Sequence, residues 1–324
     1  MSNELNTRKP VDGAAAGLMV VLCLIWGLQQ TAIKAAAPDV APVLQVALRS
    51  GVAALLVGLF RGWISRDPWI KGVAFGPGLI VGVLFAGEFL FVAEGLRYTT
   101  ASHMAVFPYT SPMFAALGLH FFLPDERLTR SQWIGIGLAF VGIAITFLGP
   151  KGGALNEASP DWLLGDLLGL CAGASWGLTT VAIRVTRLSE APAAQTLFYQ
   201  LVAGFVVLMA ATVATDQLRF TSSVLAWSSL GFQTIIVSFA SFLAWFWLLR
   251  SYLAARLGVL SFMTPLFGVA MGAILLDEPL NAYFLGGAAC VLGGMLIVNG
   301  KSILRKKETA PEASRLEDDP VRLT

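Results

Sequence analysis

The sequence contains few charged residues, three cysteines and only two histidines. Charged side chains account for 13% of its 324 residues, against roughly 25% in soluble domains, whereas apolar side chains account for 56%. So few charges cannot cover the surface of a protein in water, and this scarcity excludes a water-soluble enzyme. Because the cysteines lie in separate apolar runs without ligand-like spacing, neither a disulfide nor a metal site is expected.

Other absences narrow the possible functions. The net charge of +2 gives no electrostatic reason to expect a nucleic-acid partner. An integral membrane enzyme would need a constellation such as His-Glu-x-x-His, and two histidines leave little for acid–base chemistry. We therefore expect no enzymatic activity and no cofactor. A membrane enzyme and a receptor that transports nothing stay open as alternatives.

Apolar runs fill most of the chain, and turn residues or charges separate them. Each run is about 20 residues long, the length that an α-helix needs to cross the bilayer core. They predict an all-α polytopic membrane protein with ten transmembrane helices, at residues 15–36, 42–60, 72–95, 101–123, 131–149, 163–186, 192–214, 224–249, 254–276 and 281–300. The first run follows Arg8 and Lys9 as a signal peptide would, but it is longer than the apolar region of a signal peptide.

The distribution of positive charge predicts how these helices are oriented. If the N-terminus is cytoplasmic, the loops assigned to the cytoplasm carry 15 Lys and Arg residues, and the loops on the other side carry four. Lys and Arg concentrate in the cytoplasmic loops of membrane proteins. Both termini are therefore predicted to be cytoplasmic.

The two halves of the chain resemble each other. The Trp26-Gly27-Leu28 motif recurs 150 residues later as Trp176-Gly177-Leu178, and the Pro112 region recurs 153 residues later around Pro265. Each half holds five predicted helices, and this odd number means that the second half must cross the membrane upside down. Inverted repeats are typical of secondary transporters, whose sites lie near the membrane midplane between the repeats.

This repeat predicts two five-helix units around a central cavity. The predicted parts are a cytoplasmic N-terminal segment at 1–14, a first repeat at 15–149, a periplasmic linker at 150–162, a second repeat at 163–300 and a charged cytoplasmic tail at 301–324. The tail lacks hydrophobic periodicity, so we expect it to be disordered.

A known family shares these features. The paired Trp-Gly motifs, the Leu-Arg-Tyr-Thr-Thr-Ala-Ser run at 96–102 and the Pro-then-acidic segments at 112–126 and 265–278 resemble the ten-helix, EamA-type branch of the drug/metabolite transporter superfamily. The chain is most similar to bacterial exporters of aromatic amino acids, which also expel dications such as paraquat (methyl viologen).

The resemblance implies a monomeric secondary transporter in the lipid bilayer of the bacterial inner membrane. It would export small amphipathic metabolites, aromatic or bulky apolar amino acids, by alternating access. An exporter of cationic drugs or other metabolites coupled to protons is the alternative.

Two prolines are candidate helix breaks. Pro112 and Pro265 fall near the middle of the fourth and ninth predicted helices, where proline removes a backbone hydrogen bond. Broken helices at membrane depth either line a cavity or are packed in protein, so a hinge and a static kink are both open. The neighbouring hydroxyls of Ser111 and Thr264 are candidate substrate contacts.

Aromatic and polar side chains within the spans provide further candidates for substrate binding. Trp26 and Trp176 lie in mid-span rather than at the membrane interfaces, where tryptophan usually collects. Their rings either form the cavity wall, where a flat aromatic substrate would stack, or fill space against glycines. The other candidates, from the fourth and eighth predicted helices, are Phe107, Tyr109, Gln233 and Phe242.

Glu88 is the sharpest candidate, because a charge inside the membrane is expensive and usually functional. Arg49 lies at a similar predicted depth, so the two residues either form a structural salt bridge or leave Glu88 free to meet a cationic substrate. His103 is either an interfacial residue or part of a polar cluster with Glu94 and Glu88.

The first predicted helix has no carboxylate; it offers only Gln29 and Gln30. The four-helix drug exporters of the resembled superfamily use a carboxylate there for proton coupling. Either Glu88 takes over that role, or the protein is a facilitator driven by the substrate gradient, which is the reading we favour.

The topology can be tested by cysteine labelling. A Gly153→Cys variant should react with an impermeant thiol reagent from outside the cell, whereas a Ser302→Cys variant should react only after the cells are opened. Labelling of both positions from the same side would contradict the ten-helix arrangement.

Overall fold

The computed structural model describes residues 12–59, 75–124, 127–148, 161–252, 257 and 260–308. In these ranges the chain is helical, with an isolated β-bridge between Val40 and Phe220 and no strand. Six of the described helices are long and apolar enough to cross a membrane. The predicted all-α membrane class is therefore confirmed.

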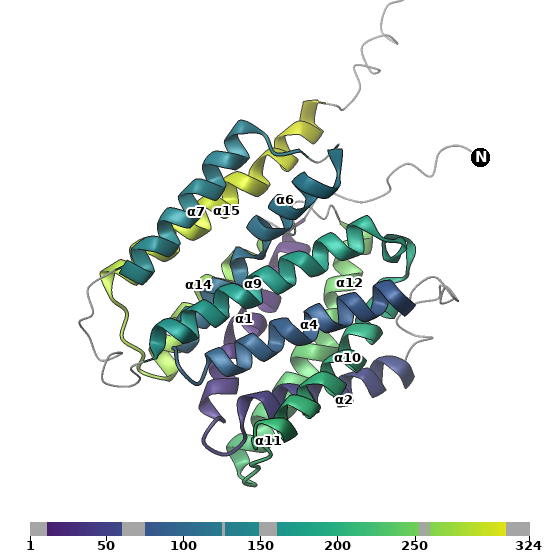
Figure 1. The fold of residues 1–324 in the computed structure, drawn as a ribbon, viewed down its shortest axis with the longest axis vertical. Helices are drawn as coiled ribbons and strands as arrows, with labels where there is room; N and C mark the ends of the chain where they lie inside the picture. The colour runs from purple at the N-terminus through teal and green to yellow at the C-terminus, as the bar shows by residue number, and fades with distance from the viewer. Residues whose placement is uncertain are drawn as a thin grey trace, which may run out of the picture.

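Seven predicted spans are continuous helices. They are α1 (Gly13–Ala35), α2 (Pro42–Leu59), α4 (Phe75–Gly95), α7 (Arg130–Leu148), α9 (Trp162–Val185), α10 (Ala193–Ala214) and α15 (Ala282–Glu308). A short 3-10 turn, η3 (Arg187–Glu190), joins α9 to α10. Figure 1 shows these helices packed side by side, with α7 and α15 as a pair along one edge of the bundle.

Three predicted spans are interrupted. The fourth consists of α5 (Ala101–Val106), the 3-10 segment η1 (Phe107–Thr110) and α6 (Ser111–Phe122). The eighth consists of α11 (Val224–Gly231), the π-helix η4 (Phe232–Ser241) and α12 (Phe242–Ser251). The ninth contains α14 (Met263–Leu275). A π-helix of this length is rare, and hydropathy alone does not predict it.

The end of the tenth span differs from the prediction. α15 continues through residues 301–308, which the sequence assigned to a disordered tail. This segment contains good helix formers, which favour a continued helix. The remaining tail at 309–324 and the predicted linker at 150–160 lie outside the described residues.

The bundle has two distinct ends. We call the end that contains Lys34, Thr99, Asp166 and Glu278 the polar end, because these side chains form hydrogen bonds there. We call the opposite end, where α1 begins and α15 finishes, the terminal end (Figure 1). An even number of spans requires the first and last described helices to begin and finish at the same end.

Glycines allow the interrupted fourth span to pack tightly against α9. A Cβ atom at Gly173 would lie 2.4 Å from Thr110 Oγ1, and a Cβ atom at Gly177 would lie 2.7 Å from Phe114 Cβ. On its other side, α5 meets α14, where a Cβ atom at Gly268 would lie 2.3 Å from Ala105 Cβ. The small residues thus act as close-packing devices between membrane helices, as their spacing predicts.

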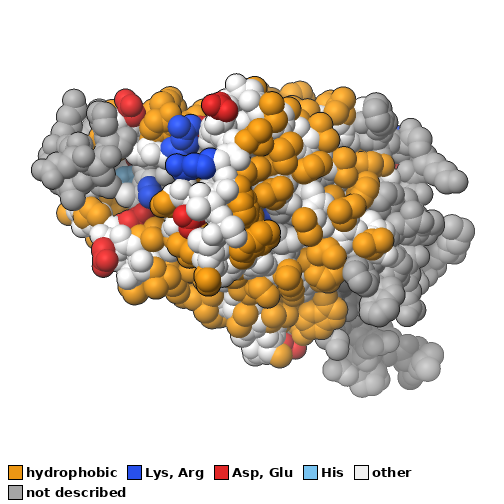
Figure 2. Space-filling view, turned by 90° about the horizontal axis from the view of Figure 1, so that it is seen from below, with side chains coloured by type: hydrophobic (Ala, Val, Ile, Leu, Met, Phe, Trp, Pro, Cys, Tyr) orange, Lys and Arg blue, Asp and Glu red, His pale blue; other side chains and the backbone are white. Residues whose placement is uncertain are grey.

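The outer surface is apolar over most of its height. Large exposed apolar side chains occur on several of the membrane helices, among them Leu55, Leu79, Ile134, Val206 and Ile235. Figure 2 shows apolar side chains over most of the face it draws, with charged side chains gathered toward one end. Exposed charges such as Arg97 and Arg187 lie at opposite ends of the bundle, and an apolar band between charged ends matches a protein surrounded by lipid.

The pairing of α7 with α15 gives a matched test of this packing. A Cβ atom at Gly142 would lie 2.5 Å from the Gly287 carbonyl oxygen, whereas nothing lies within 4 Å of a Cβ atom at Gly137 in the same helix. We expect Gly142→Val to lower stability by about 1–3 kcal/mol through overpacking, and Gly137→Val to change it little. Thermal unfolding of the purified protein in detergent would measure both, and equal losses would contradict the packing.

Candidate functional site

The fourth span is broken near its middle. Its backbone changes from α-helix to 3-10 helix at η1, and Pro108 and Pro112 provide no N–H donors on either side of Tyr109. Thr110 Oγ1 donates to the Phe107 carbonyl at 2.7 Å and so satisfies one acceptor at the break. Pro112 lies in the first turn of α6, where proline is well tolerated, so the break precedes it by about one turn.

The ninth span is interrupted at the matching place. Ser261 and Phe262 form a turn ahead of α14, and Pro265 lies in the first turn of that helix. α1 passes close to this start, because a Cβ atom at Gly27 would lie 3.0 Å from the Thr264 carbonyl oxygen. Pro112 and Pro265 thus each lie in the first turn of the helix that follows a break, about one turn after the break itself.

Four of the predicted site residues meet between these two breaks. The rings of Tyr109 and Trp176 pack edge to face, with centroids 5.4 Å apart. The Tyr109 hydroxyl lies beside the side chain of Thr264, and Glu88 is within electrostatic range of the same hydroxyl. Thr264 Oγ1 is buried and has no hydrogen-bond partner among the described residues. We call Glu88, Tyr109, Trp176 and Thr264 the central cluster.

Four elements of the bundle supply the central cluster, and a fifth contacts it. Its members come from α4, η1, α9 and α14, and Cys23 of α1 lies beside Thr264. A carboxylate, two aromatic rings and an unpaired hydroxyl thus converge at mid-depth. Such a set can bind a cation or an ammonium group together with a flat apolar group.

Trp26 lies apart from the central cluster and contacts the eighth span. Its Nε1 donates to Ser241 Oγ at 2.9 Å, at the end of the π-helix, and its ring packs edge to face on Trp245 at 5.6 Å. Both partners belong to the C-terminal half, so Trp26 joins the two halves of the chain. Phe242, one residue after the π-helix, packs against the main apolar core.

Gln233 belongs to a buried polar group between α1, α2 and η4. Its Nε2 donates to Gln45 Oε1 at 2.8 Å and to Ser229 Oγ at 2.9 Å. Gln45 Nε2 in turn donates to the backbone carbonyls of Ile33 and Val40. Gln233 therefore turns inward, as a polar amide in a membrane helix should, and its Oε1 has no partner among the described residues.

Arg49 and Glu88 lie on neighbouring helices and attract each other electrostatically. The Arg49 side chain is 3% exposed, and its guanidinium lies 4.4 Å from the centre of the Phe89 ring. Arg49 Nη1 has no hydrogen-bond partner among the described residues. Glu88 is partly exposed rather than fully buried. Arg49 thus supplies a fixed positive charge within electrostatic range of the Glu88 carboxylate.

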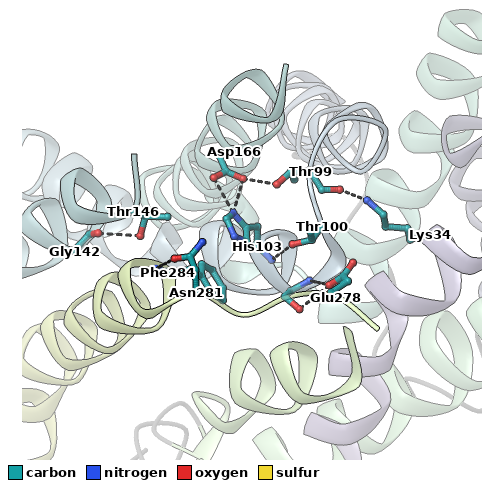
Figure 3. A network of polar contacts seen from close by, with 11 residues as sticks. Lys34, Thr99, Thr100, His103, Gly142, Thr146, Asp166, Glu278, Asn281 and Phe284 are labelled. Carbon is teal, nitrogen blue, oxygen red and sulfur yellow. Dashed lines mark hydrogen bonds and ion pairs between the residues drawn. The ribbon is translucent and has the colours of Figure 1, made fainter. Parts of the chain in front are cut away.

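A second group of polar residues closes the polar end (Figure 3). His103 Nδ1 lies 2.8 Å from Asp166 Oδ2, and Thr99 Oγ1 donates to Asp166 Oδ1 at 2.5 Å. The His103 ring stacks on Phe284, with centroids 4.1 Å apart and an interplanar angle of 7°. Asp166 is fully buried, and its carboxylate oxygens are satisfied by Thr99 and His103.

Glu278 caps the N-terminus of α5 from the other half of the chain. Its carboxylate accepts hydrogen bonds from the backbone N–H groups of Ala101 and Ser102, at 2.6 and 2.8 Å, and from Ser102 Oγ at 2.6 Å. Lys34 Nζ donates to the carbonyl oxygens of Leu96 and Thr99, just before α5. A carboxylate at a helix N-terminus satisfies free donors and complements the helix dipole.

The remaining sequence candidates lie outside the central cluster. Phe107 packs against Gly169 of α9, and Ser111 packs against Gly177 through its carbonyl. The suggested cluster of His103 with Glu94 is wrong, because Glu94 bonds Arg97 and Gln217 at the surface. Phe107 and Ser111 therefore shape the break.

Sequence reasoning missed Asp166 and Glu278. Asp166 lies a few residues inside the sixth predicted span, where its charge was a usable signal. Glu278 was read only as part of a span boundary, and its place on α5 comes from tertiary contacts.

The geometry of the described residues supports neither a hydrolase site nor a metal site. The segment from Gly173 to Gly177 reads Gly-Ala-Ser-Trp-Gly, which fits the Gly-x-Ser-x-Gly pattern of hydrolases. It lies inside α9, however, and its glycines pack on the fourth span, whereas the serine of that hydrolase pattern sits on a strand-to-helix turn. Among the described residues, no group of three His, Cys, Asp or Glu side chains could hold a metal ion.

Comparison with known proteins identifies the family. The profile of the EamA-like transporter family matches the chain twice, at residues 14–148 and 163–300. The chain belongs to the EamA-like transporter family. The family predicted from the sequence is therefore confirmed, and this EamA-family protein is a multi-pass membrane transporter.

Several relatives cover nearly the whole of this EamA-family chain. A probable amino-acid metabolite efflux pump of Salmonella typhimurium is 26% identical, covering 88% of this chain and 94% of its own. A protein of the same description from Escherichia coli is also 26% identical, with the same coverage. An uncharacterized transporter of Archaeoglobus fulgidus is 27% identical, covering 86% of this chain and 97% of its own.

A solved crystal structure supports the same fold. It is 19% identical and matches with a TM-score of 0.58, over 93% of this chain and 100% of its own.

Proposed function

We propose that this EamA-family transporter exports small amphipathic metabolites, aromatic or bulky apolar amino acids, by alternating access. The central cluster carries the proposal, because the Glu88 carboxylate is within electrostatic range of Tyr109, whose ring packs on Trp176. A carboxylate suits the ammonium group of an amino acid, and the rings suit a flat apolar side chain. The description of two relatives as probable amino-acid metabolite efflux pumps points in the same direction.

The two halves of the chain are proposed to be inverted repeats. Five predicted spans in each half, two matches to the family profile and corresponding breaks in the fourth and ninth spans support this arrangement. The substrate would bind between the breaks, near the membrane midplane, as in other transporters of this architecture. A relative movement of the halves would then expose the central cluster to each side in turn.

We further propose that the protein is a monomer in the bacterial inner membrane, with the terminal end in the cytoplasm. The excess of Lys and Arg in the loops at that end supports this orientation. The first helix has no carboxylate, which favours a facilitator driven by the substrate gradient. Proton-coupled export of cationic drugs is the second candidate, and the presence of the Glu88 carboxylate within the membrane helix α4 is the observation that favours it.

Reconstitution in liposomes tests both candidates. Purified protein should move labelled phenylalanine down its gradient, unaltered and without a pH gradient. Labelled methyl viologen should move more slowly under the same conditions. Movement of methyl viologen alone, dependent on a pH gradient, would favour the second candidate, and chemical conversion of the label would show an enzyme instead. A preceding thermal-shift screen over amino acids would rank ligands, because binding stabilises the folded state.

Glu88 gives the sharpest test of the site. We expect Glu88→Gln to weaken the binding of a zwitterionic or cationic substrate by roughly 10- to 100-fold, because a hydrogen bond to a charged group is lost. The amide keeps the size of the side chain, so the folded yield should change little. Isothermal binding and liposome flux measure the first effect, and gel filtration measures the second.

The variant Arg49→Gln and the double variant separate binding from a structural salt bridge. If Glu88 mainly neutralises Arg49, Glu88→Gln should lower the folded yield, and adding Arg49→Gln should restore both yield and flux. Restored flux in the double variant would reject the substrate-binding role. Continued loss of flux with a normal yield would support it.

The helix breaks give a second mechanistic test. We expect Pro112→Ala and Pro265→Ala to slow flux several-fold while leaving the folded yield nearly unchanged, because an added N–H lets the helix extend back across the break. Flux measurements on both single variants and on the double variant check this. Wild-type flux in all three would mean that the prolines mark static kinks.

A further inference from the structure

Two hydroxyl–carboxylate hydrogen bonds join the halves of the chain at opposite ends. At the polar end, Thr99 Oγ1 donates to Asp166 Oδ1 at 2.5 Å. At the terminal end, the Tyr252 hydroxyl donates to Asp12 Oδ2 at 2.9 Å. Thr99 lies just before the interrupted fourth span, and Tyr252 lies at the end of α12, just before the interrupted ninth span. In each case the carboxylate comes from the start of a long helix in the other half.

The two contacts occupy corresponding places in the chain. Thr99 and Tyr252 are separated by 153 residues, the spacing that also relates Pro112 to Pro265. Asp12 is the N-cap of α1, and Asp166 lies in the first turns of α9.

The match between the two carboxylates is displaced by one turn. α1 and α9 are related by a spacing of 150, so Asp166 lies four residues further into its helix than Asp12 does. Four residues are about one helical turn, so the two carboxylates occupy equivalent faces of α1 and α9.

The two contacts differ in strength. Asp166 is fully buried and also bonds His103, so water cannot replace its partners until the polar end opens. Asp12 is exposed, and its other oxygen caps α1 by accepting from the Ala15 N–H at 2.8 Å. The hydrogen bond to Asp12, with smaller effects of burial and of the Asp12 charge, raises the pKa of Tyr252. The phenol therefore stays a donor throughout the physiological pH range.

We propose that these two hydrogen bonds hold two gates closed, and that transport opens the gates in turn. Thr99 and Asp166 hold the polar gate, and Tyr252 and Asp12 hold the terminal gate. This inference rests on the alternating access proposed above. In this structure both gates are closed. Because the terminal gate has an exposed carboxylate that water can reach, it opens more readily than the polar gate.

A buried side chain lies beneath each gate and can report its opening. Met19 is fully buried and belongs to the apolar cluster that contains Tyr252, Leu248 and Leu257 at the terminal end. Met104 is fully buried one turn after Thr100, beneath the polar gate. Opening one gate should expose one of these positions and leave the other protected.

Thiol labelling of the full-length protein in detergent tests the proposal. The first reporter is Met19→Cys in a Cys23→Ser, Cys171→Ser, Cys290→Ser background. The second is Met104→Cys in the same background. We expect Tyr252→Phe to raise the labelling rate of the first reporter about tenfold and to leave the second unchanged.

The polar gate should behave in the opposite way. Asp166→Asn should raise the labelling rate of the second reporter and leave the first unchanged. If Asp166→Asn fails to fold, Thr99→Val removes the same hydrogen bond and keeps the contact between Asp166 and His103. Glu190→Gln is the control, because it breaks an exposed pair with Arg187 inside one loop and should change neither rate.

Opposite selectivity of the two gate variants supports the proposal. Equal effects on both reporters, or no effect on either, would overturn it, because a general loss of stability exposes both thiols alike. Labelling needs no substrate, so this result is independent of which solute is transported. Normal phenylalanine flux with unchanged labelling would reject the gates alone, and selective labelling without flux would reject the proposed substrate alone.

Discussion

The N-terminus of α5 is held by carboxylates from the opposite half of the chain, and the central cluster depends on this contact. In the hydrocarbon core no water is available to accept from the first N–H groups of a helix, so the protein itself must supply acceptors. Glu278 accepts from the backbone at Ala101 and Ser102, while Asp166 accepts from the Thr99 hydroxyl. Because α5 leads directly into η1, this anchoring places Tyr109 against Trp176.

The bundle holds its halves together in two ways that differ in how easily they can be broken. α7 and α15 pack through glycines, where backbones touch, and Gln132 Nε2 donates to the Val298 carbonyl oxygen between them. At the two ends of the bundle, by contrast, the halves meet through hydrogen bonds such as those of Asp12 and Glu278. Water can take over such bonds at an opening end, so this interface can separate while the α7–α15 pair keeps the halves joined.

The sequence predicted some parts of the site and missed others for identifiable reasons. Glu88 stood out because a charge inside an apolar run has few structural explanations, and Tyr109 and Trp176 were both candidates although nothing local related them. Asp166 resembled a charge near a span end, and Glu278 resembled a turn residue. Their roles depend on a helix that lies over 60 residues away in the first case and over 170 in the second.

The sequence by itself determined the class of protein, the spans and the family, because the bilayer requires long apolar helices whatever their packing. It also located the breaks to within a turn, since proline removes a backbone donor wherever it occurs. Only the tertiary structure decided which side chains meet, because partners such as Thr99 and Asp166 belong to different halves. The π-helix also depends on packing. Its hydrogen bonds join residues five apart instead of four, and a hydropathy profile does not reveal that difference.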